Sequence, residues 1–159
     1  MDENAKRSAL RLFGYGVYVL GAKDGGEIDA ATVNWAMQTS FRPPLVVAGV
    51  KKDGRPFALL HRSRHFTLSF LESGQRDLAF AFFKPTRVDG SRLNGFPFEE
   101  APESGAPVLS DALGWIEAKV RHIDDSGDHA VVIGEVTDAA VRRTGKPLSL
   151  AELGLTYGG

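Results

Sequence analysis

Runs of β-strand character follow one another at short intervals along this chain, and few segments have the length and periodicity of a helix. Residues 15–22 and 28 to about 37 are joined by Asp24-Gly25-Gly26, a turn sequence typical of hairpins. Further runs of this kind lie at residues 45–50, 65–71, 114–123 and 130–141. Because parallel strands need long crossover connections, this spacing predicts an antiparallel barrel or sandwich.

Two of these runs carry different burial signals. Residues 45–50 are apolar without alternation, so we expect a strand that is buried on both faces. Residues 114–123 alternate strictly, which is the pattern of a strand with two unlike faces. One face carries Ile116, Ala118 and Val120, and the other carries Glu117, Lys119 and Arg121.

The segments between the strands predict short helices and one long loop. Pro56 suits the first turn of a helix that we expect to end near Arg64, and residues 75–83 have helical spacing. Ser149 and Glu152 fit a capping box for a short final helix. Residues 84–107 are rich in Pro and Gly without periodicity, so we expect a long functional or mobile loop. With no repeat or linker, residues 1–159 are expected to form a single domain.

The composition excludes several classes of function. A formal net charge of -1 gives no global field for nucleic acid or an anionic membrane, so neither partner is expected. The absence of cysteine excludes disulfides and thiolate metal sites, and the histidines lack ligand spacing, so no metal is expected. No apolar run approaches the ~20 residues of a membrane span, and no secretory signal begins the chain. We therefore expect a cytoplasmic protein.

The polar segment before residue 45 could bind the edge of a heterocyclic ring. It offers hydrogen-bond donors and acceptors on Asn34, Gln38, Thr39 and Ser40. Trp35 and Met37 should point to the same face of a strand, where they could pack on a ring or in the core. The alternative is a polar strand end whose side chains are satisfied within the protein.

A cationic turn follows the apolar run. Lys51, Lys52 and Arg55 lie beside a predicted helix start, where free backbone N–H groups and the helix dipole favour an anion. The alternative is a solvated basic turn, because lysine and arginine are common at surfaces.

Gly127-Asp128-His129 forms a third candidate, at the turn before the last long strand. A histidine held beside a carboxylate could orient a substrate or donate a proton near neutral pH. The alternative is a histidine that is merely solvated. Motifs for a Rossmann fold, a P-loop or a serine hydrolase elbow do not occur in the sequence.

Taken in order, these pieces resemble the flavin reductase-like family of FMN-binding split-barrel proteins. The resemblance covers about residues 13–147 and rests mainly on Thr-Val-Asn-Trp-Ala-Met-Gln-Thr-Ser-Phe at 32–41, followed by Arg-Pro-Pro-Leu-Val at 42–46. Residues 63–69, 75–79, 105–109 and 127–136 support it. The resemblance implies a mainly β fold, an antiparallel Greek-key split β-barrel with a few short helices. It also implies a homodimer with flavin at the subunit interface.

The resemblance implies FMN as the cofactor, ahead of FAD, and assigns residues to each part of it. The edge of the isoalloxazine ring would be lined by Asn34, Trp35, Ala36 and Met37. The ring or the ribityl chain would be reached by Gln38, Thr39 and Ser40. The phosphate would be met by Val50, Lys51, Lys52 and Arg55. Phe83 and Lys84 belong to a segment that approaches the flavin in relatives, and His129 matches a histidine near the nicotinamide. Many relatives have a Ser/Thr-rich phosphate turn, which this chain replaces by Lys-Lys-Asp-Gly-Arg-Pro. Some carry a cysteine where this chain has Ala118.

The function implied by the resemblance is that of an NAD(P)H-dependent flavin oxidoreductase. Hydride would pass from nicotinamide C4 to flavin N5 with the reacting atoms roughly 3–3.5 Å apart. The flavin would supply the redox chemistry, and the protein would bind and orient the flavin. An acceptor or a redox partner protein would then take the electrons. Two alternatives remain. The chain could be an FMN-binding electron carrier without a nicotinamide site, in which His129 is structural, or a barrel that has lost its cofactor.

Overall fold

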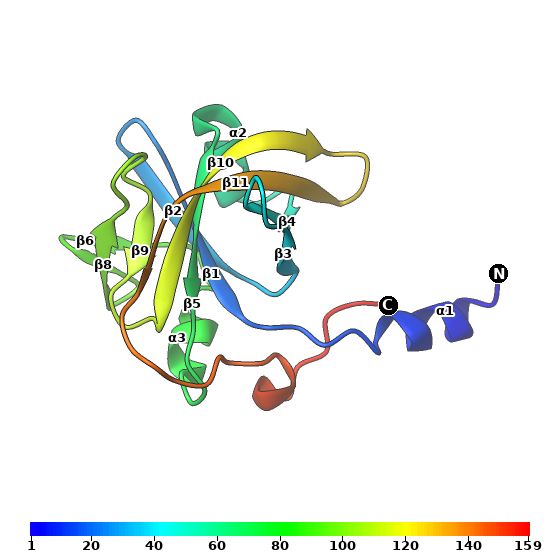
Figure 1. The fold of residues 1–159 in the computed structure, drawn as a ribbon. Helices are drawn as coiled ribbons and strands as arrows, with labels where there is room; N and C mark the ends of the chain where they lie inside the picture. Colours follow the sequence, from blue (N-terminus) through cyan, green and yellow to red (C-terminus); the bar gives the residue numbers. More distant parts are fainter.

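The computed structural model describes residues 1–159 and has a mainly β fold (Figure 1). Seven antiparallel strands form one sheet in the order β2-β1-β5-β10-β11-β4-β3. Their bounds are β1 Tyr18–Asp24, β2 Glu27–Val33, β3 Ala36–Ser40, β4 Leu45–Lys51, β5 His65–Phe70, β10 Gly114–Asp124 and β11 His129–Val141. A second sheet contains β6 Val88–Asp89, β7 Arg92–Leu93, β8 Phe96–Glu100 and β9 Pro107–Leu109. The order of the large sheet ends at β2 and β3, so its hydrogen bonding does not close into a barrel.

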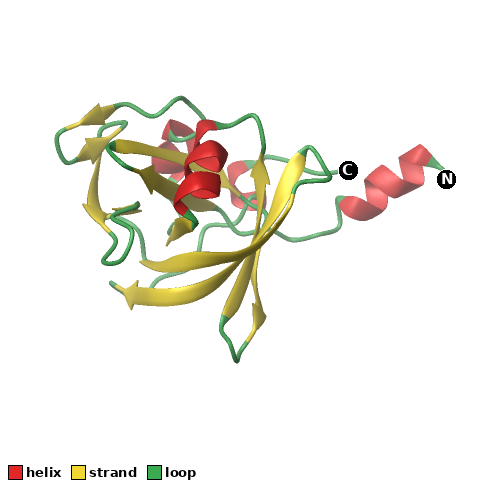
Figure 2. Ribbon diagram, turned by 90° about the horizontal axis from the view of Figure 1, so that it is seen from above, coloured by secondary structure: helices red, strands yellow, loops and turns green.

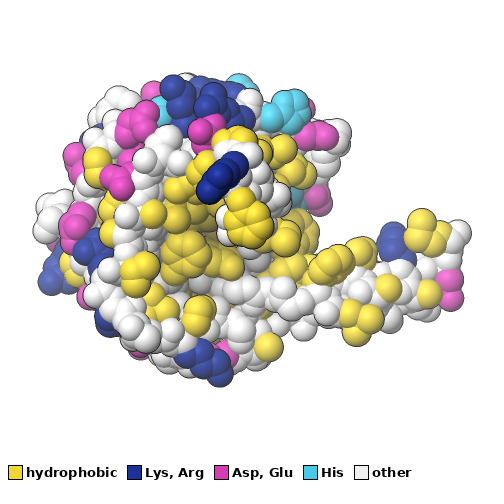
Figure 3. Space-filling view, in the orientation of Figure 1, with side chains coloured by type: hydrophobic (Ala, Val, Ile, Leu, Met, Phe, Trp, Pro, Cys, Tyr) yellow, Lys and Arg dark blue, Asp and Glu magenta, His cyan; other side chains and the backbone are white.

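The large sheet is strongly curved, so its two ends approach each other (Figures 1 and 2). An apolar groove of about 390 Å³ is lined by Tyr18 of β1, Phe70 of β5 and Met37 of β3. Figure 3 shows hydrophobic side chains gathered over this part of the molecule, between β1 and β3. The sheet is therefore curved like a barrel wall and open along one side.

Short helices connect and flank the strands. They are α1 Glu3–Leu10, α2 Arg55–Ser63, α3 Arg76–Ala81 and a 3-10 turn at Ala151–Leu153. Helix α2 has Pro56 in its first turn and ends at Arg64, which adopts a left-handed conformation with φ 60°. Helix α1 projects from the body with no buried residue (Figures 1 and 3). None of the helices is long and apolar enough to cross a membrane.

Two large apolar clusters stabilise the fold. The first packs α2 against the concave side of the sheet, with Leu59, Leu60 and Phe66 fully buried. The second joins α3 to the smaller sheet and the C-terminal segment through Phe82 and Leu148. Burying each such side chain contributes about 1.5–3 kcal/mol, so the two clusters fix α2 and α3 beside the strands.

Most of the expected strands are confirmed, and the first hairpin closes as predicted. Asp24 pairs with Glu27 across the turn, and Gly25 has φ +58°, a conformation that glycine adopts without penalty. The strand expected from 28 to about 37 is interrupted at Asn34 and Trp35, where the chain leaves β1 and joins β4. This interruption creates the edge of the cavity described below.

Two expectations are wrong, one about the segment 84–107 and one about the burial of strand β4. Residues 84–107 are not a loop without structure, because they contain β6, β7 and β8. The first two of these strands have only two residues each, which is too short for an alternating pattern to show in the sequence. Strand β4 is not buried on both faces in this chain. Its burial alternates, with Val46, Ala48 and Val50 buried and the intervening side chains half-buried.

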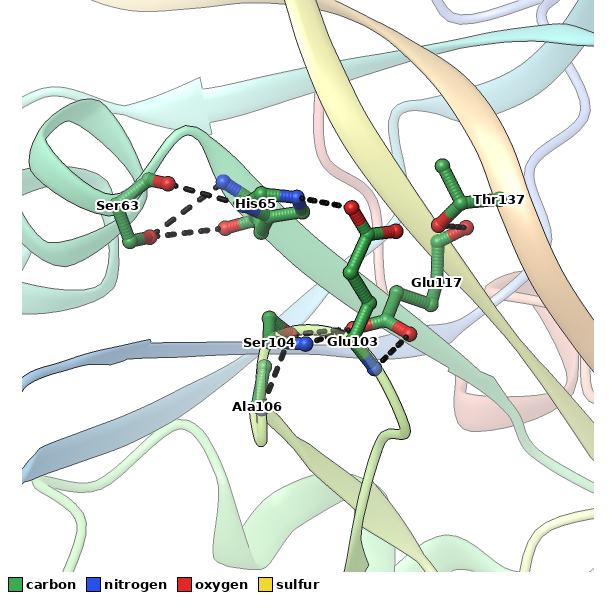
Figure 4. Close-up of polar contacts among 7 residues, drawn as sticks. All are labelled: Ser63, His65, Glu103, Ser104, Ala106, Glu117 and Thr137. Carbon is green, nitrogen blue, oxygen red and sulfur yellow. Dashed lines mark hydrogen bonds and ion pairs between the residues drawn. The ribbon is translucent and has the colours of Figure 1, made fainter.

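The face of β10 that carries Lys119 and Arg121 is not uniformly exposed. Glu117 on that face is completely buried, and its carboxylate accepts hydrogen bonds from the backbone N–H groups of Glu103 and Ser104 at 3.0 and 2.8 Å and from the Ser104 hydroxyl (Figure 4). A buried carboxylate is tolerated when donors surround it. Glu117 therefore fastens the turn after β8 onto the large sheet.

We expect Glu117→Gln to lower the free energy of unfolding by about 1–3 kcal/mol, because it removes the buried charge on which three hydrogen-bond donors converge. Urea denaturation measures the change. The matched control is Glu99→Gln, which removes an exposed ion pair with Arg142 and should cost less than about 1 kcal/mol. Equal effects of the two substitutions would show that the Glu117 carboxylate does not fasten this turn.

Candidate functional site

A cavity of about 460 Å³ lies where β2 ends and β3 begins. We call it the site cavity. Its walls include Trp35, Phe57, Phe83, His129 and Tyr157, so aromatic rings from five separate segments meet there. Its volume and apolar walls are those of a small-molecule site.

Three of these rings form a compact group. The ring centroid of Trp35 lies 4.8 Å from that of His129 and 5.3 Å from that of Tyr157. The indole ring rests on β4 at Gly49, where an added Cβ would lie 2.9 Å from Trp35 Cε3. A glycine at this position therefore allows the tryptophan to lie against the strand.

Two buried N–H groups on the wall of the cavity have no partner. They are the side-chain amide nitrogen Nδ2 of Asn34 and the indole nitrogen Nε1 of Trp35. A buried donor without an acceptor costs about 1–3 kcal/mol, so such groups call for an explanation. A planar ligand with acceptor atoms along its edge would satisfy both. The donor set therefore fits the polar edge of a flavin.

One end of the cavity offers an anion site. Gly54 precedes α2 without a side-chain cap, so the first amide groups of the helix lack intrahelical acceptors. Lys51 and Gly54 both line the cavity. The Lys51 ammonium lies 3.3 Å from the Asp53 carboxylate, in a pair that is mostly exposed and therefore weak. A phosphate could compete for this lysine.

His129 is bonded through both ring nitrogens. Nδ1 lies 2.9 Å from Asp128 Oδ1, and Nε2 lies 2.7 Å from the Tyr157 hydroxyl. The hydrogen bond from His129 holds the pKa of the Asp128 carboxyl below its usual range. The register of β11 with β4 places His129 opposite Lys51, and its side chain is only 16% exposed.

Comparison with known protein families identifies the chain. The family model described as a flavin reductase like domain matches residues 10–157. The chain belongs to this family.

Relatives and solved structures of the flavin reductase-like family agree over nearly the whole chain. The NADH-dependent flavin reductase StyB of Pseudomonas fluorescens is 31% identical over 160 residues, covering 100% of this chain and 91% of StyB. The NADH:FAD oxidoreductase SgcE6 of Streptomyces globisporus superposes with a TM-score of 0.82 at 28% identity, covering 96% and 91% of the two chains. The flavin reductase PheA2 superposes with a TM-score of 0.79 at 30% identity, covering 99% and 98%.

Other curated relatives of the family are longer. This chain spans 58%, 24%, 25% and 43% of the length of four of them.

The structure brings six of the predicted flavin reductase site residues together. The residues that line the site cavity are Asn34, Trp35, Val50, Lys51, Phe83 and His129. Ala36, Met37 and Gln38 line the apolar groove instead. Because β3 pairs with β4 only after Trp35, the segment 34–38 is divided between the two spaces.

The remaining predicted residues line neither space, namely Thr39, Ser40, Lys52, Arg55 and Lys84. Two of these cations already have partners. The Lys52 ammonium donates to the carbonyl oxygen of Asp125. The Arg55 guanidinium lies 2.9 Å from the Glu27 carboxylate and 3.6 Å from that of Asp29. The cationic turn therefore presents Lys51 alone to the cavity.

Several lining residues were not found by sequence reasoning. Thr32 begins the motif at 32–41 but was given no role, and Phe57 carried no signal beyond its place in a helix. Tyr157 lies in a Gly-rich terminal segment, 28 positions from the histidine that it contacts. No local pattern could have joined these residues, because the site is assembled by strand pairing.

We expect Gly49→Ala to displace the Trp35 ring and destabilise the protein by about 1–3 kcal/mol, the usual cost of overpacking. Urea unfolding and tryptophan fluorescence report the two effects. The matched control is Gly26→Ala in the first hairpin, where an added Cβ meets nothing within 4 Å. If the two variants behave alike, the contact between Gly49 and Trp35 is not restrictive.

Proposed function

We propose that this chain is an NADH-dependent flavin reductase that binds FMN in the site cavity. The observation that carries this proposal is the pair of unpartnered donors on Asn34 and Trp35, on an aromatic wall that leads to an uncapped helix start. When bound, the flavin accepts hydride from a nicotinamide and passes the electrons to an acceptor. Family membership and the similarity to StyB support the same activity.

Each lining residue receives a role from its place in the cavity. Asn34 and Trp35 donate hydrogen bonds to the polar ring edge, and Phe83 packs against the rings. Lys51, beside Val50, and the first amides of α2 hold the phosphate. His129 positions the nicotinamide. Further contacts, as the family resemblance implies, are assigned to Ala36, Met37, Gln38, Thr39, Ser40, Lys52, Arg55 and Lys84.

NADH is the preferred donor in this proposal, with NADPH as the alternative. SgcE6 has been solved with NAD and FAD fragments at 29% identity to this chain, whereas the flavin reductase HpaC has been solved with NADP+ at 27% identity. One lysine and no arginine line the cavity, and this Lys51 is assigned to the flavin. FMN is preferred to FAD because this single cation matches a single phosphate.

We also propose that the curved sheet is a Greek-key split barrel and that two copies form a homodimer. Met37, which lines the apolar groove, is 65% exposed, and Phe41, which follows β3, is 86% exposed. Exposed apolar patches of this kind mark protein interfaces. Sedimentation equilibrium tests the dimer.

We further propose that the chain folds as a single domain, that it is located in the cytoplasm and that it passes electrons to a redox partner protein.

We expect Lys51→Glu to weaken FMN binding by at least tenfold, because it places a negative charge beside the phosphate. Fluorescence titration at low salt measures the dissociation constant. Lys146→Glu makes the same charge change at an exposed residue outside the cavity and should leave it unchanged. Equal affinity in both variants would remove Lys51 from the site.

We expect His129→Ala to keep FMN affinity within about twofold and to slow reduction of the bound flavin by NADH at least tenfold, because the nicotinamide loses its positioning group. Anaerobic stopped-flow bleaching of the flavin absorption measures the rate. Slow and unsaturable bleaching of the unsubstituted protein would instead favour the electron carrier. A protein that takes up no FMN would favour loss of the cofactor.

A further inference from the structure

The hydrogen bonds around His129 fix the orientation of its ring. The Asp128 carboxylate can only accept, so Nδ1 carries the hydrogen of this 2.9 Å contact. In the neutral ring Nε2 is then an acceptor, and the Tyr157 hydroxyl donates to it at 2.7 Å. Both ring nitrogens are thus used within the protein, and neither is left to donate a proton to a ligand.

Tyr157 is held where it can fix this ring. Its own ring meets Trp35 edge-on, with centroids 5.3 Å apart and planes at 61°, and it meets His129 in the same manner at 5.8 Å and 76°. The neighbouring Gly158 carbonyl accepts a hydrogen bond from Arg11. These contacts bring the terminal segment across the site cavity and leave the tyrosine hydroxyl directed at Nε2.

Tyr157 contributes little to the core, because it is 44% exposed. The groups that face His129 are Asp128 from the turn, Trp35 from the start of β3, Lys51 from the paired strand and Tyr157 from the terminal segment. Among them only Asp128 and Tyr157 bond to its nitrogens. The Asp128 side chain is 95% exposed, whereas Tyr157 is 44% exposed and also packs against Trp35, so the hydroxyl is the more enclosed of the two partners.

We propose that Tyr157 is a positioning residue for flavin reduction. Its hydroxyl bonds to Nε2 and holds the His129 ring in a fixed plane, so that the imidazole orients the nicotinamide while both of its nitrogens are occupied within the protein. This inference rests on the proposed function and deepens it. Hydride transfer is sensitive to such placement, because a displacement of about 1 Å can cost a hundredfold in rate.

The first test is kinetic and uses Tyr157→Phe, which keeps the ring and removes only the hydroxyl. We expect kcat for NADH-dependent flavin reduction to fall about tenfold, while the KM for NADH and the dissociation constant for FMN stay within about twofold, as for an interaction that matters in the transition state. The matched control is Ser63→Ala at the end of α2, which removes a hydroxyl that hydrogen-bonds to His65 outside the site cavity and the apolar groove. It should leave all three constants unchanged.

The second test is spectroscopic and needs no flavin. In nitrogen-15 NMR of the unsubstituted protein, His129 should show a protonated Nδ1 and an Nε2 shifted by an accepted hydrogen bond. In Tyr157→Phe the Nε2 resonance should move toward the position of a free acceptor nitrogen. A protonated Nε2 in the unsubstituted protein would overturn the inference, because the hydroxyl could not then be the donor.

The outcomes separate this inference from the proposed function. If His129→Ala slows reduction and Tyr157→Phe does not, the inference fails and the function stands. If Tyr157→Phe raises kcat or lowers the KM for NADH, the terminal segment obstructs the nicotinamide and the inference fails. If NADH does not reduce flavin bound to the unsubstituted protein, the proposed function fails and the role of Tyr157 fails with it.

Discussion

Strand β4 pairs with β3 on one side and with β11 on the other, and the register of these two ladders decides which side chains meet at the site cavity. Trp35 bonds to Gly49 through its carbonyl at 2.7 Å, and His129 stands opposite Lys51. Because side chains alternate along a strand, a slip of one residue would turn His129 to the other face. The aromatic group, the cation and the histidine therefore depend on one set of backbone hydrogen bonds.

The register is itself protected by the two apolar clusters. Val46, Ala48 and Val50 point into the cluster that contains α2, so a shift of β4 would expose them. The same strand thus presents its buried side chains to the core and its alternate positions to Trp35 and His129. Stability and site geometry are linked by this division, and the strand whose burial stabilises the fold also carries the binding surface.

Local sequence patterns predicted the parts of the fold that local chemistry determines. The hairpin at Asp24 to Glu27 and the alternating β10 follow from turn residues and periodicity. The burial of Glu117 could not be foreseen, because the donors that satisfy it come from a turn of the smaller sheet. Arg55 was assigned to an anion on helix position alone, whereas the first hairpin brings Glu27 to it. The contact between His129 and Tyr157 is likewise a product of tertiary structure.

Two segments that are distant in the sequence lie side by side, since Arg11 bonds to the Gly158 carbonyl and Tyr157 reaches the cavity wall. The stacked rings of Phe13 and Tyr15 continue from the first of these segments toward Trp35. Residues 11–15 and 157–158 consequently flank the same aromatic wall. A substitution in either segment can therefore alter access to the ring of Trp35, although neither belongs to the large sheet.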